Sequence, residues 1–362
     1  LLSRMTLEEK VGQMCQYTRT AVYDRMTDEQ LDTLTREGKV GSLLNIHDLR
    51  RIHTLQKQAM QSRLGIPLLV GIDAVHGNAL ISGTTVYPTP ITLASTWDPG
   101  LVEEIGKQTA LETRITGIHW SFAPNVDVAR DARWGRVGET FGEDPVLVSD
   151  MGAAMIRGLQ GEDFTGRDRV IACAKHLIAG SEPANGLNFA PMDISERTLR
   201  EVFLPPFTAA VEAGVFTVMA AHNEVNGVPC HADRWLLTDI LRGELNFDGF
   251  VVSDWTDVPR LATLHKVVQD MQEASKLTVE AGLDMNMHGP GFFGAVLELV
   301  RNDRLSETRI NSSVRRILKA KFQLGLFEHP YGNLEKRRTV LRKEKHIRTA
   351  LEAARKGIVL LK

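Results

Sequence analysis

The chain of 362 residues is poor in cysteine, in net charge and in long apolar runs. Its three cysteines, Cys15, Cys173 and Cys230, lie too far apart for a metal-ligand motif or a small disulfide framework. Lysine plus arginine number 43 and aspartate plus glutamate 45, so the net charge of −2 predicts no nucleic-acid partner. No apolar run approaches the roughly 18–20 residues of a membrane-spanning helix, so we expect no membrane partner either.

Motifs for metals and cofactors are missing as well. There is no His-Glu-x-x-His, no paired cysteine motif and no calcium loop. We therefore expect neither a metal ion nor a cofactor. The chain begins at Leu1 without a signal-peptide pattern, so we interpret it as a piece of a longer gene product. The sequence leaves its compartment and its oligomeric state open.

Short apolar runs recur along the chain roughly every 25 to 50 residues, with amphipathic stretches between them. The runs are residues 40–44, 68–72, 118–122, 170–174, 216–220, 250–253 and 282–285. This spacing suits helical crossovers between parallel strands and predicts an α/β fold, a (β/α)8-like barrel of TIM type. An open doubly wound sheet is the alternative, but no glycine-rich phosphate turn follows an early strand.

Helix start signals precede the first predicted strand and stand between later ones. Thr6 to Glu9 form a capping-box pattern, and Asp98-Pro99 predicts the start of a helix over residues 100–117. Ser195 predicts the start of another helix that runs toward residue 212.

The C-terminal part differs in composition. We expect the barrel to occupy residues 1–326, and residues 327–362 to be a linker and the beginning of a further α/β domain. Residues 336–348 are basic, which is typical of a solvated helix face. The apolar tail 358–361 (IVLL) is typical of a strand that opens the further domain.

Polar side chains follow five of the predicted strands. They are Asp73, Asp127 with the arginine-rich residues 130–136, Lys175-His176, His222-Asn223-Glu224 and Asp254-Trp255. Because the carboxyl ends of parallel strands meet at one edge of a barrel, we expect these side chains to converge there.

The pair Asp254 and Trp255 suits sugar cleavage in particular, because a carboxylate can attack an anomeric carbon and an indole can cover the apolar face of the ring. Each candidate also has a purely structural explanation. Asp73 and Asp254 can cap helices, and His176 and His222 can be core histidines. The arginines can pair with neighbouring carboxylates, namely Glu139, Glu143 and Asp144. The hypothesis depends on all of these residues occurring together.

Together these segments resemble the N-terminal domain of glycoside hydrolase family 3, which comprises β-glucosidases, β-xylosidases and related exo-acting enzymes. The resemblance runs from about Met5 to Lys362 and lies in four blocks. The blocks are residues 71–77 (GIDAVHG), residues 130–136 (RDARWGR) followed by 139–145 (ETFGEDP), residues 174–176 (AKH) and residues 249–255 (GFVVSDW).

The resemblance implies a β-glucosidase-like, retaining hydrolase of terminal non-reducing β-D-glycosyl residues, acting on small glycosides or oligosaccharides. Asp254 would be the nucleophile that forms a covalent glycosyl–enzyme intermediate. The residues implied in sugar binding are Asp73, Arg136, Lys175, His176, His222 and Trp255. A periplasmic or secreted location is implied as well.

Retaining hydrolysis needs a second carboxyl group about 5–5.5 Å from the nucleophile. The resemblance implies that this acid/base is a glutamate of the domain beyond Lys362; Glu182 or Glu224 is the alternative within the chain. Two positions depart from the family pattern. His222 stands where an aromatic residue is common, and residues 185–188 (NGLN) replace a Gly-Arg-Asp-like stretch that supplies a substrate contact.

Two other functions stay open from the sequence. Lys175 at a strand end can form a Schiff base, as in lysine-dependent aldolases. A barrel that binds carbohydrate without cleaving it is the non-enzymatic alternative.

Overall fold

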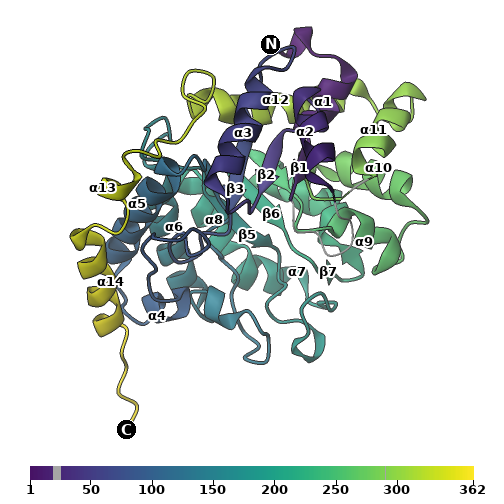
Figure 1. Cartoon of the computed structure of the whole chain (residues 1–362). Coiled ribbons are helices and arrows are strands. Elements are labelled where there is room, and N and C mark those ends of the chain that lie inside the picture. Colours follow the sequence, from purple (N-terminus) through teal and green to yellow (C-terminus); the bar gives the residue numbers. More distant parts are fainter. Residues whose placement is uncertain (19–25, 290) are drawn as a thin grey trace. The chain divides into compact units, whose positions relative to one another are not determined.

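The computed structural model describes residues 1–18, 26–289 and 291–362, which form two compact units. The first unit comprises residues 1–71 and 231–331, and the second comprises residues 72–230 and 332–362. In both units short parallel strands alternate with helices (Figure 1), so the predicted α/β class is confirmed.

The elements of the first unit come from both ends of its sequence. Its helices are η1 (Leu2–Arg4), α1 (Leu7–Gln13), α2 (Asp28–Arg36), α3 (Leu49–Met60), η6 (Trp235–Glu244, a π-helix), α9 (Asp257–Thr263), α10 (Met271–Ala281), α11 (Phe292–Arg301) and α12 (Glu307–Gln323). Its strands are β1 (Cys15–Tyr17), β2 (Ser42–Leu44), β3 (Leu69–Ile72, whose last residue opens the second unit), β9 (Phe250–Val252) and β10 (Asn286–Met287).

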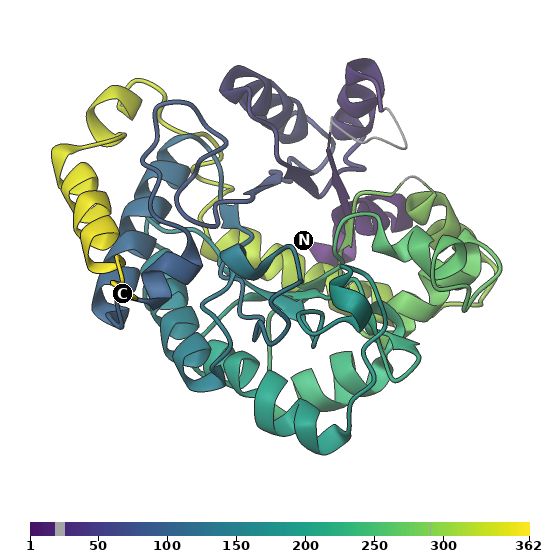
Figure 2. The ribbon, with the colours of Figure 1, turned by 90° about the horizontal axis from the view of Figure 1, so that it is seen from below.

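The first unit is built on a parallel sheet in the order β10–β1–β2–β3. Its register is set by the pairs Cys15–Asn286, Gln16–Ser42 and Ser42–Leu69, and Val252 of β9 pairs with Met285 just before β10. Every residue of β1, β2 and β9 is buried, as expected where both faces of a parallel sheet are covered. Helices α2 and α3 pack side by side, and α10 packs on α11 (Figure 2).

The second unit contributes the remaining elements. Its helices are α4 (Pro90–Ala94), α5 (Pro99–Ile115), η2 (Val137–Glu139), α6 (Pro145–Gln160), η3 (Ala184–Gly186), α7 (Glu196–Thr198), η4 (Leu199–Phe203, a π-helix), α8 (Pro205–Glu212), η5 (Cys230–Ala232, at the boundary), α13 (Arg337–Val340) and α14 (Glu344–Lys356). Its strands are β4 (Trp120–Ser121), β5 (Cys173–Leu177), β6 (Thr217–Ala220) and the hairpin β7 (Glu224–Val225) and β8 (Val228–Pro229).

Parallel pairing also organises the second unit. Trp120 of β4 pairs with Ile171, and Cys173 of β5 pairs with Thr217 of β6. Helices α5, α6 and α8 pack in sequence against one another. A Cβ atom on Gly158 would lie 2.3 Å from the Glu103 carbonyl oxygen, so the close approach of α5 and α6 requires glycine there.

Capping signals in the sequence predicted the starts of these helices correctly. The Thr6 capping box is present, with reciprocal hydrogen bonds between Thr6 and Glu9. The Asp98 side chain accepts from the Leu101 N–H at the start of α5, as predicted. The helix expected after Ser195 begins there but passes through the π-helix η4 and restarts at Pro205.

Some strand predictions were wrong. Strand β1 lies outside every predicted strand, β5 begins three residues later than predicted, and the last strand is 286–287 rather than 282–285. Both β1 and β10 contain a buried polar residue, and Gln16 of β1 donates to the Ser42 hydroxyl inside the sheet. A polar amide within a strand of only three residues leaves no apolar run, and the strand prediction relied on apolar runs.

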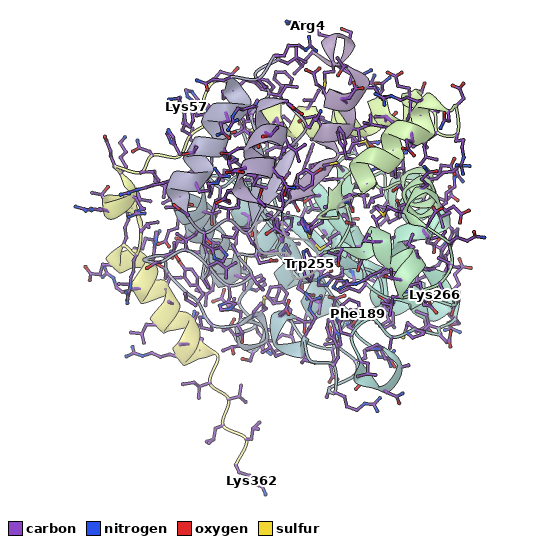
Figure 3. The ribbon with its side chains drawn as sticks, turned by 45° about the vertical axis from the view of Figure 1, so that its right-hand side comes forward. Arg4, Lys57, Phe189, Trp255, Lys266 and Lys362 are labelled. Carbon is purple, nitrogen blue, oxygen red and sulfur yellow. The ribbon has the colours of Figure 1, made fainter. Side chains whose placement is uncertain are left out.

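The tail 358–361 forms no strand in this chain. Beyond α14 it extends to Lys362 with its apolar side chains exposed, Leu361 by 89% (Figure 3). Among the described helices, none combines the length and the apolar character needed to cross a bilayer.

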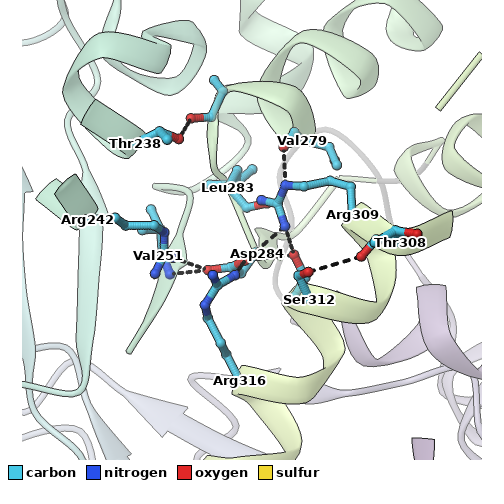
Figure 4. A network of polar contacts seen from close by, with 12 residues as sticks. Thr238, Arg242, Val251, Val279, Leu283, Asp284, Thr308, Arg309, Ser312 and Arg316 are labelled. Carbon is cyan, nitrogen blue, oxygen red and sulfur yellow. Dashed lines mark hydrogen bonds and ion pairs between the residues drawn. The ribbon is translucent and has the colours of Figure 1, made fainter. Parts of the chain in front are cut away.

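One buried carboxylate organises the polar contacts of the first unit (Figure 4). Asp284 is fully buried and is surrounded by the guanidinium groups of Arg242, Arg309 and Arg316. These arginines come from η6 and α12, so one aspartate joins these two helices to the segment before β10. Burial raises the pKa of this carboxyl, but the three guanidinium groups outweigh burial and hold the pKa below its usual value.

Candidate functional site

Strand β5 carries two of the predicted site residues within the strand rather than after it. Lys175 and His176 are both buried, and the segment from Pro124 to Val126 pairs alongside Lys175 in a parallel bridge. The Lys175 N–H donates to the Pro124 carbonyl and the Val126 N–H donates to the Lys175 carbonyl, so this pairing brings the next residue, Asp127, beside His176.

Lys175 forms an ion pair with Asp73. Nζ lies 3.1 Å from Oδ1 of Asp73; the lysine side chain is 4% exposed, whereas the Asp73 carboxylate is 40% exposed. Among the described residues, Asp73 is the one hydrogen-bond acceptor of the Lys175 ammonium. An ammonium has three N–H bonds, so two N–H bonds of Lys175 have no acceptor among these residues. A buried ammonium beside an accessible carboxylate can donate to one hydroxyl group while the carboxylate accepts from another.

A second chain of contacts runs through His176. Its Nδ1 lies 2.8 Å from Oδ2 of Asp127, and its Nε2 lies 2.9 Å from a terminal nitrogen of Arg136. The Arg136 guanidinium in turn donates twice to Glu139, with both distances 3.0 Å. Partial burial raises the pKa of the Glu139 carboxyl, but Arg136 and Lys175 outweigh burial and hold the pKa below its usual value.

The other arginines of residues 130–136 also have structural partners, but these are not the carboxylates of the alternative explanation, Glu139, Glu143 and Asp144. Arg133 pairs with Asp131 on the surface, and Arg130 lies 3.7 Å from Glu182. Asp144 accepts from the N–H groups of Val146 and Leu147 and so caps α6.

His222 lies near these groups in an aromatic cluster. Its ring stacks on the His176 ring, with the ring centroids 6.2 Å apart. It also packs against the Phe189 ring, with the ring centroids 4.2 Å apart. Phe189 therefore supplies an aromatic surface next to His222. The loop that carries Phe189 is anchored by Trp134, whose indole N–H donates to Asn188 at 3.0 Å.

The loop after Asp73 is held by backbone and side-chain contacts. The Tyr87 N–H donates to the His76 carbonyl, and a Cβ on Gly77 would lie 2.3 Å from the Thr85 carbonyl oxygen. Gly77 has φ +90°, which favours glycine. Buried Glu112 accepts from both the N–H and the hydroxyl of Thr85, at 2.6 and 2.8 Å.

Glu112 also binds the segment that precedes the tail. It accepts from the Arg342 N–H at 2.7 Å and lies 2.6 Å from Nδ1 of His346 in α14. Burial raises the pKa of Glu112, but His346 and the other donors outweigh burial and keep the pKa below its usual value. One carboxylate thus connects the loop after Asp73 to α14.

In the first unit, Asp254 follows β9 directly and is 7% exposed. Its Oδ1 accepts from the Trp255 N–H at 2.6 Å, and its own N–H donates to Nε2 of His231 at 2.9 Å. One oxygen of the carboxylate is therefore held by a backbone N–H donor. Trp255 is half-buried (Figure 3), and its carbonyl accepts from Arg260 at 2.9 Å.

Arg260 also pairs with buried Asp257 at 2.6 Å. Thr256 has φ +59° and turns the chain from the strand end into α9. These contacts fix the main chain on both sides of Asp254, so the carboxylate stands on a rigid strand end rather than on a free loop.

The structure thus brings together Asp73, Arg136, Lys175, His176 and His222 in the second unit, whereas Asp254 and Trp255 belong to the first. Asp127, which was expected among the converging side chains without a role of its own, lies in this cluster as well. Sequence reasoning missed Phe189, because nothing in the residues around it indicates its contact with His222. Taken within each unit, the described residues contain no group of three histidine, cysteine, aspartate or glutamate ligands close enough to hold a metal ion.

Known proteins share the sequence family and the fold of this chain. The family model described as "Glycosyl hydrolase family 3 N terminal domain" matches residues 6–320. A β-xylosidase of Formosa agariphila is 43% identical over 93% of this chain and 48% of its own length, and a periplasmic β-glucosidase of Salmonella typhimurium is 34% identical over 100% and 47%. The crystal structure of a β-glucosidase from Listeria innocua in complex with glucose matches with TM-score 0.91 and 33% identity, over 100% of this chain and 51% of that one.

These matches confirm the predicted TIM-type barrel as the fold and favour neither an aldolase nor a binding module. The chain spans about half the length of the relatives it matches. The chain belongs to glycosyl hydrolase family 3, and it corresponds to the N-terminal domain of that family.

Proposed function

We propose that the protein hydrolyses terminal β-D-glycosyl residues from small glycosides, most similarly to a β-glucosidase, by a retaining double displacement. The observation that carries this proposal is the buried Lys175 ammonium, which has Asp73 as its one acceptor among the described residues, next to the accessible carboxylate of that aspartate. Neighbouring hydroxyl groups on a sugar ring each donate and accept, so they match such a pair. Relatives named as β-glucosidase and β-xylosidase support the class of substrate.

In the proposed reaction, Asp254 acts as the nucleophile. A carboxylate oxygen forms a bond to C1 while the bond from C1 to the leaving oxygen breaks, and that oxygen takes up a proton from a general acid. Water then attacks C1, the ester bond to Asp254 breaks, and the same group, now a base, removes a proton from the water. Asp73, Arg136, Lys175, His176 and His222 bind hydroxyl groups of the sugar, and Trp255 covers its apolar face.

The acid/base is, in our proposal, a glutamate of a further domain that follows residues 327–362 in the gene product. The relatives are about twice as long as this chain, which supports a further domain. General acid catalysis contributes about 10²–10⁴-fold, so the chain alone is expected to cleave ordinary glucosides poorly. A dinitrophenolate leaving group needs no proton and bypasses this requirement.

The test is a burst experiment with 2,4-dinitrophenyl β-D-glucoside and the matching β-D-xyloside. We expect about one equivalent of dinitrophenolate per chain, and mass spectrometry should locate the sugar on the peptide that contains Asp254. Asp254→Asn should abolish both signals. Asp303→Asn is the matched control, because Asp303 is exposed and has φ +54°, a conformation that asparagine also adopts. Absence of both burst and label in the unmodified chain would refute the proposal.

Sugar binding is tested separately with Lys175→Met. Loss of a charged hydrogen bond should weaken glucose or xylose binding by roughly 10- to 100-fold. Lys345→Met, which removes an exposed partner of Glu104, should leave binding unchanged. Because the proposed role of Lys175 is hydrogen bonding to the sugar, we expect borohydride to trap no adduct with a carbonyl substrate.

We also infer that the protein works outside the cytoplasm. The support is one relative whose name describes it as periplasmic. Fractionation of cells that express the complete gene, followed by detection of the enzyme in the periplasm or the medium, tests this inference.

A further inference from the structure

Asp127 is a buried carboxylate to which the proposed reaction gives no role. Its side chain is 1% exposed, so a sugar hydroxyl has little access to it. Its Oδ2 lies 2.8 Å from Nδ1 of His176, and its own N–H donates to the side chain of Asn125 at 2.9 Å. Asn125 is buried as well, and it stands in the parallel bridge with Lys175. The backbone of Asp127 is therefore fixed by the same pairing that fixes β5.

The chemistry of the contacts determines which nitrogen of His176 carries the proton. A guanidinium has only N–H donors, so the 2.9 Å contact from Arg136 to Nε2 requires Nε2 to be the acceptor. An imidazole that accepts at Nε2 is neutral and holds its single proton on Nδ1. That N–H donates to Asp127, and the donors therefore run in one direction, from Arg136 to His176 to Asp127.

The other tautomer does not fit these surroundings. A proton on Nε2 would face the N–H of Arg136, and Nδ1 would then present a lone pair to the Asp127 carboxylate. Both contacts would become repulsive, and buried polar groups would lose their hydrogen bonds. Of these groups, Asp127 is the one whose charge selects the productive tautomer, as the aspartate does in catalytic triads.

Arg136 is held from two sides. Glu139 binds its Nε and a terminal nitrogen, and His176 accepts from that same terminal nitrogen. Glu139 is 37% exposed, whereas His176 is 4% exposed. His176 is therefore the more deeply buried of these two supports, and it is the one that Asp127 holds.

We propose that Asp127 is a positioning residue for sugar recognition: it fixes the tautomer of His176 and thereby the orientation of Arg136. The role of Arg136 as a sugar ligand rests on the proposed function. The tautomer of His176 does not, so the two can fail independently. Asp127 acts through its neighbours and makes no contact with the reacting atoms.

The test combines ring ¹⁵N–¹H NMR of His176 with sugar binding. In the unmodified chain we expect a neutral His176 with its proton on Nδ1. In Asp127→Asn, the amide can donate to Nδ1, so we expect a shift toward the Nε2–H tautomer. We also expect binding of glucose or xylose, whichever the unmodified chain binds, to weaken by roughly 10- to 100-fold.

Asp131→Asn is the matched control, because Asp131 lies four residues further along the same segment and pairs on the surface with Arg133. It should change neither the His176 spectrum nor sugar binding. A His176 of the unmodified chain that is protonated on Nε2 or on both nitrogens overturns the proposal, even if Asp127→Asn fails to fold. An Asp127→Asn chain that folds and keeps both the tautomer and the affinity overturns it as well. Failure of Asp254 labelling with the expected tautomer intact would count against the proposed function alone.

Discussion

Replacing Asp284 with asparagine tests how a single buried charge holds the first unit together. Its two carboxylate oxygens accept five hydrogen bonds, from Ser313 at 2.7 Å, Arg316 at 3.1 Å and Arg309 at 3.3 Å on one oxygen, and from Arg242 at 2.6 Å and the Val251 N–H at 2.9 Å on the other. Asparagine has the same shape but only one acceptor oxygen and no charge. Three guanidinium groups would then face a neutral amide whose NH₂ points at a donor (Figure 4).

The expected cost follows from this geometry. Removing one partner of a buried ion pair typically destabilises a protein by about 3–5 kcal/mol. Asparagine retains one acceptor, and Arg242 and Arg309 keep their bonds to backbone carbonyls, so we place the loss at about 3 kcal/mol. Urea unfolding followed by circular dichroism measures it.

Asp248→Asn is the matched control, because Asp248 is 82% exposed and pairs with Lys319 on the surface. A surface pair of this kind contributes at most about 1 kcal/mol. The reasoning is refuted if Asp284→Asn costs no more than Asp248→Asn. The pH dependence gives a second check. Because the folded pKa of Asp284 lies below the unfolded value, its stabilisation is present above about pH 4 and is lost as the pH falls through the folded value, a loss that Asp284→Asn should not show.

Three further outcomes are expected. Burial lowers the pKa of Lys321 from 10.5 to about 7, so between these pH values the unfolded chain binds this proton and the folded chain does not. The free energy of unfolding should therefore rise from about pH 7 to 10.5. Lys321→Met should remove this rise, measured by urea unfolding at each pH. Gly77→Ala should lower the free energy of unfolding by about 1–3 kcal/mol, because the added Cβ clashes with the Thr85 carbonyl oxygen and φ is positive. The urea midpoint measures this loss, and an unchanged midpoint would contradict the loop geometry. Glu112→Gln should speed tryptic cleavage within residues 336–348, because it loosens α13 and α14. Glu103→Gln on the same helix should not, because Glu103 pairs with Lys107 and Arg157 outside this segment; equal rates would show that Glu112 does not hold it.

The candidate site was predictable where its residues follow a strand or fall in a recognisable block. Asp73 and Lys175 were expected to lie close together, and they form an ion pair although 102 positions separate them. The Arg136–Glu139 pair was anticipated as a structural alternative to sugar binding. The boundaries of β5 were missed, because Lys175 and His176 are polar and suggested a strand end, whereas both are buried within the strand.

Asp127 shows the limit of sequence reasoning. Its contact with His176 spans 49 positions and depends on a backbone bridge between residues 125 and 175. Nothing in the residues around Asp127 distinguishes it from a capping aspartate. Phe189 was missed altogether, since it meets His222 only through the course of its loop.

By itself, the sequence determined the class of fold, the starts of the main helices and the family. Capping residues, apolar runs and family blocks each consist of residues that are close together in the chain, so they can be recognised without a structure. The tertiary structure alone decided which carboxylates are buried, which nitrogen of His176 holds a proton, and how Glu112 connects α14 to the loop after Asp73. These features depend on distances between residues far apart in the chain. Burial and hydrogen bonding act through such distances, and a linear pattern does not contain them.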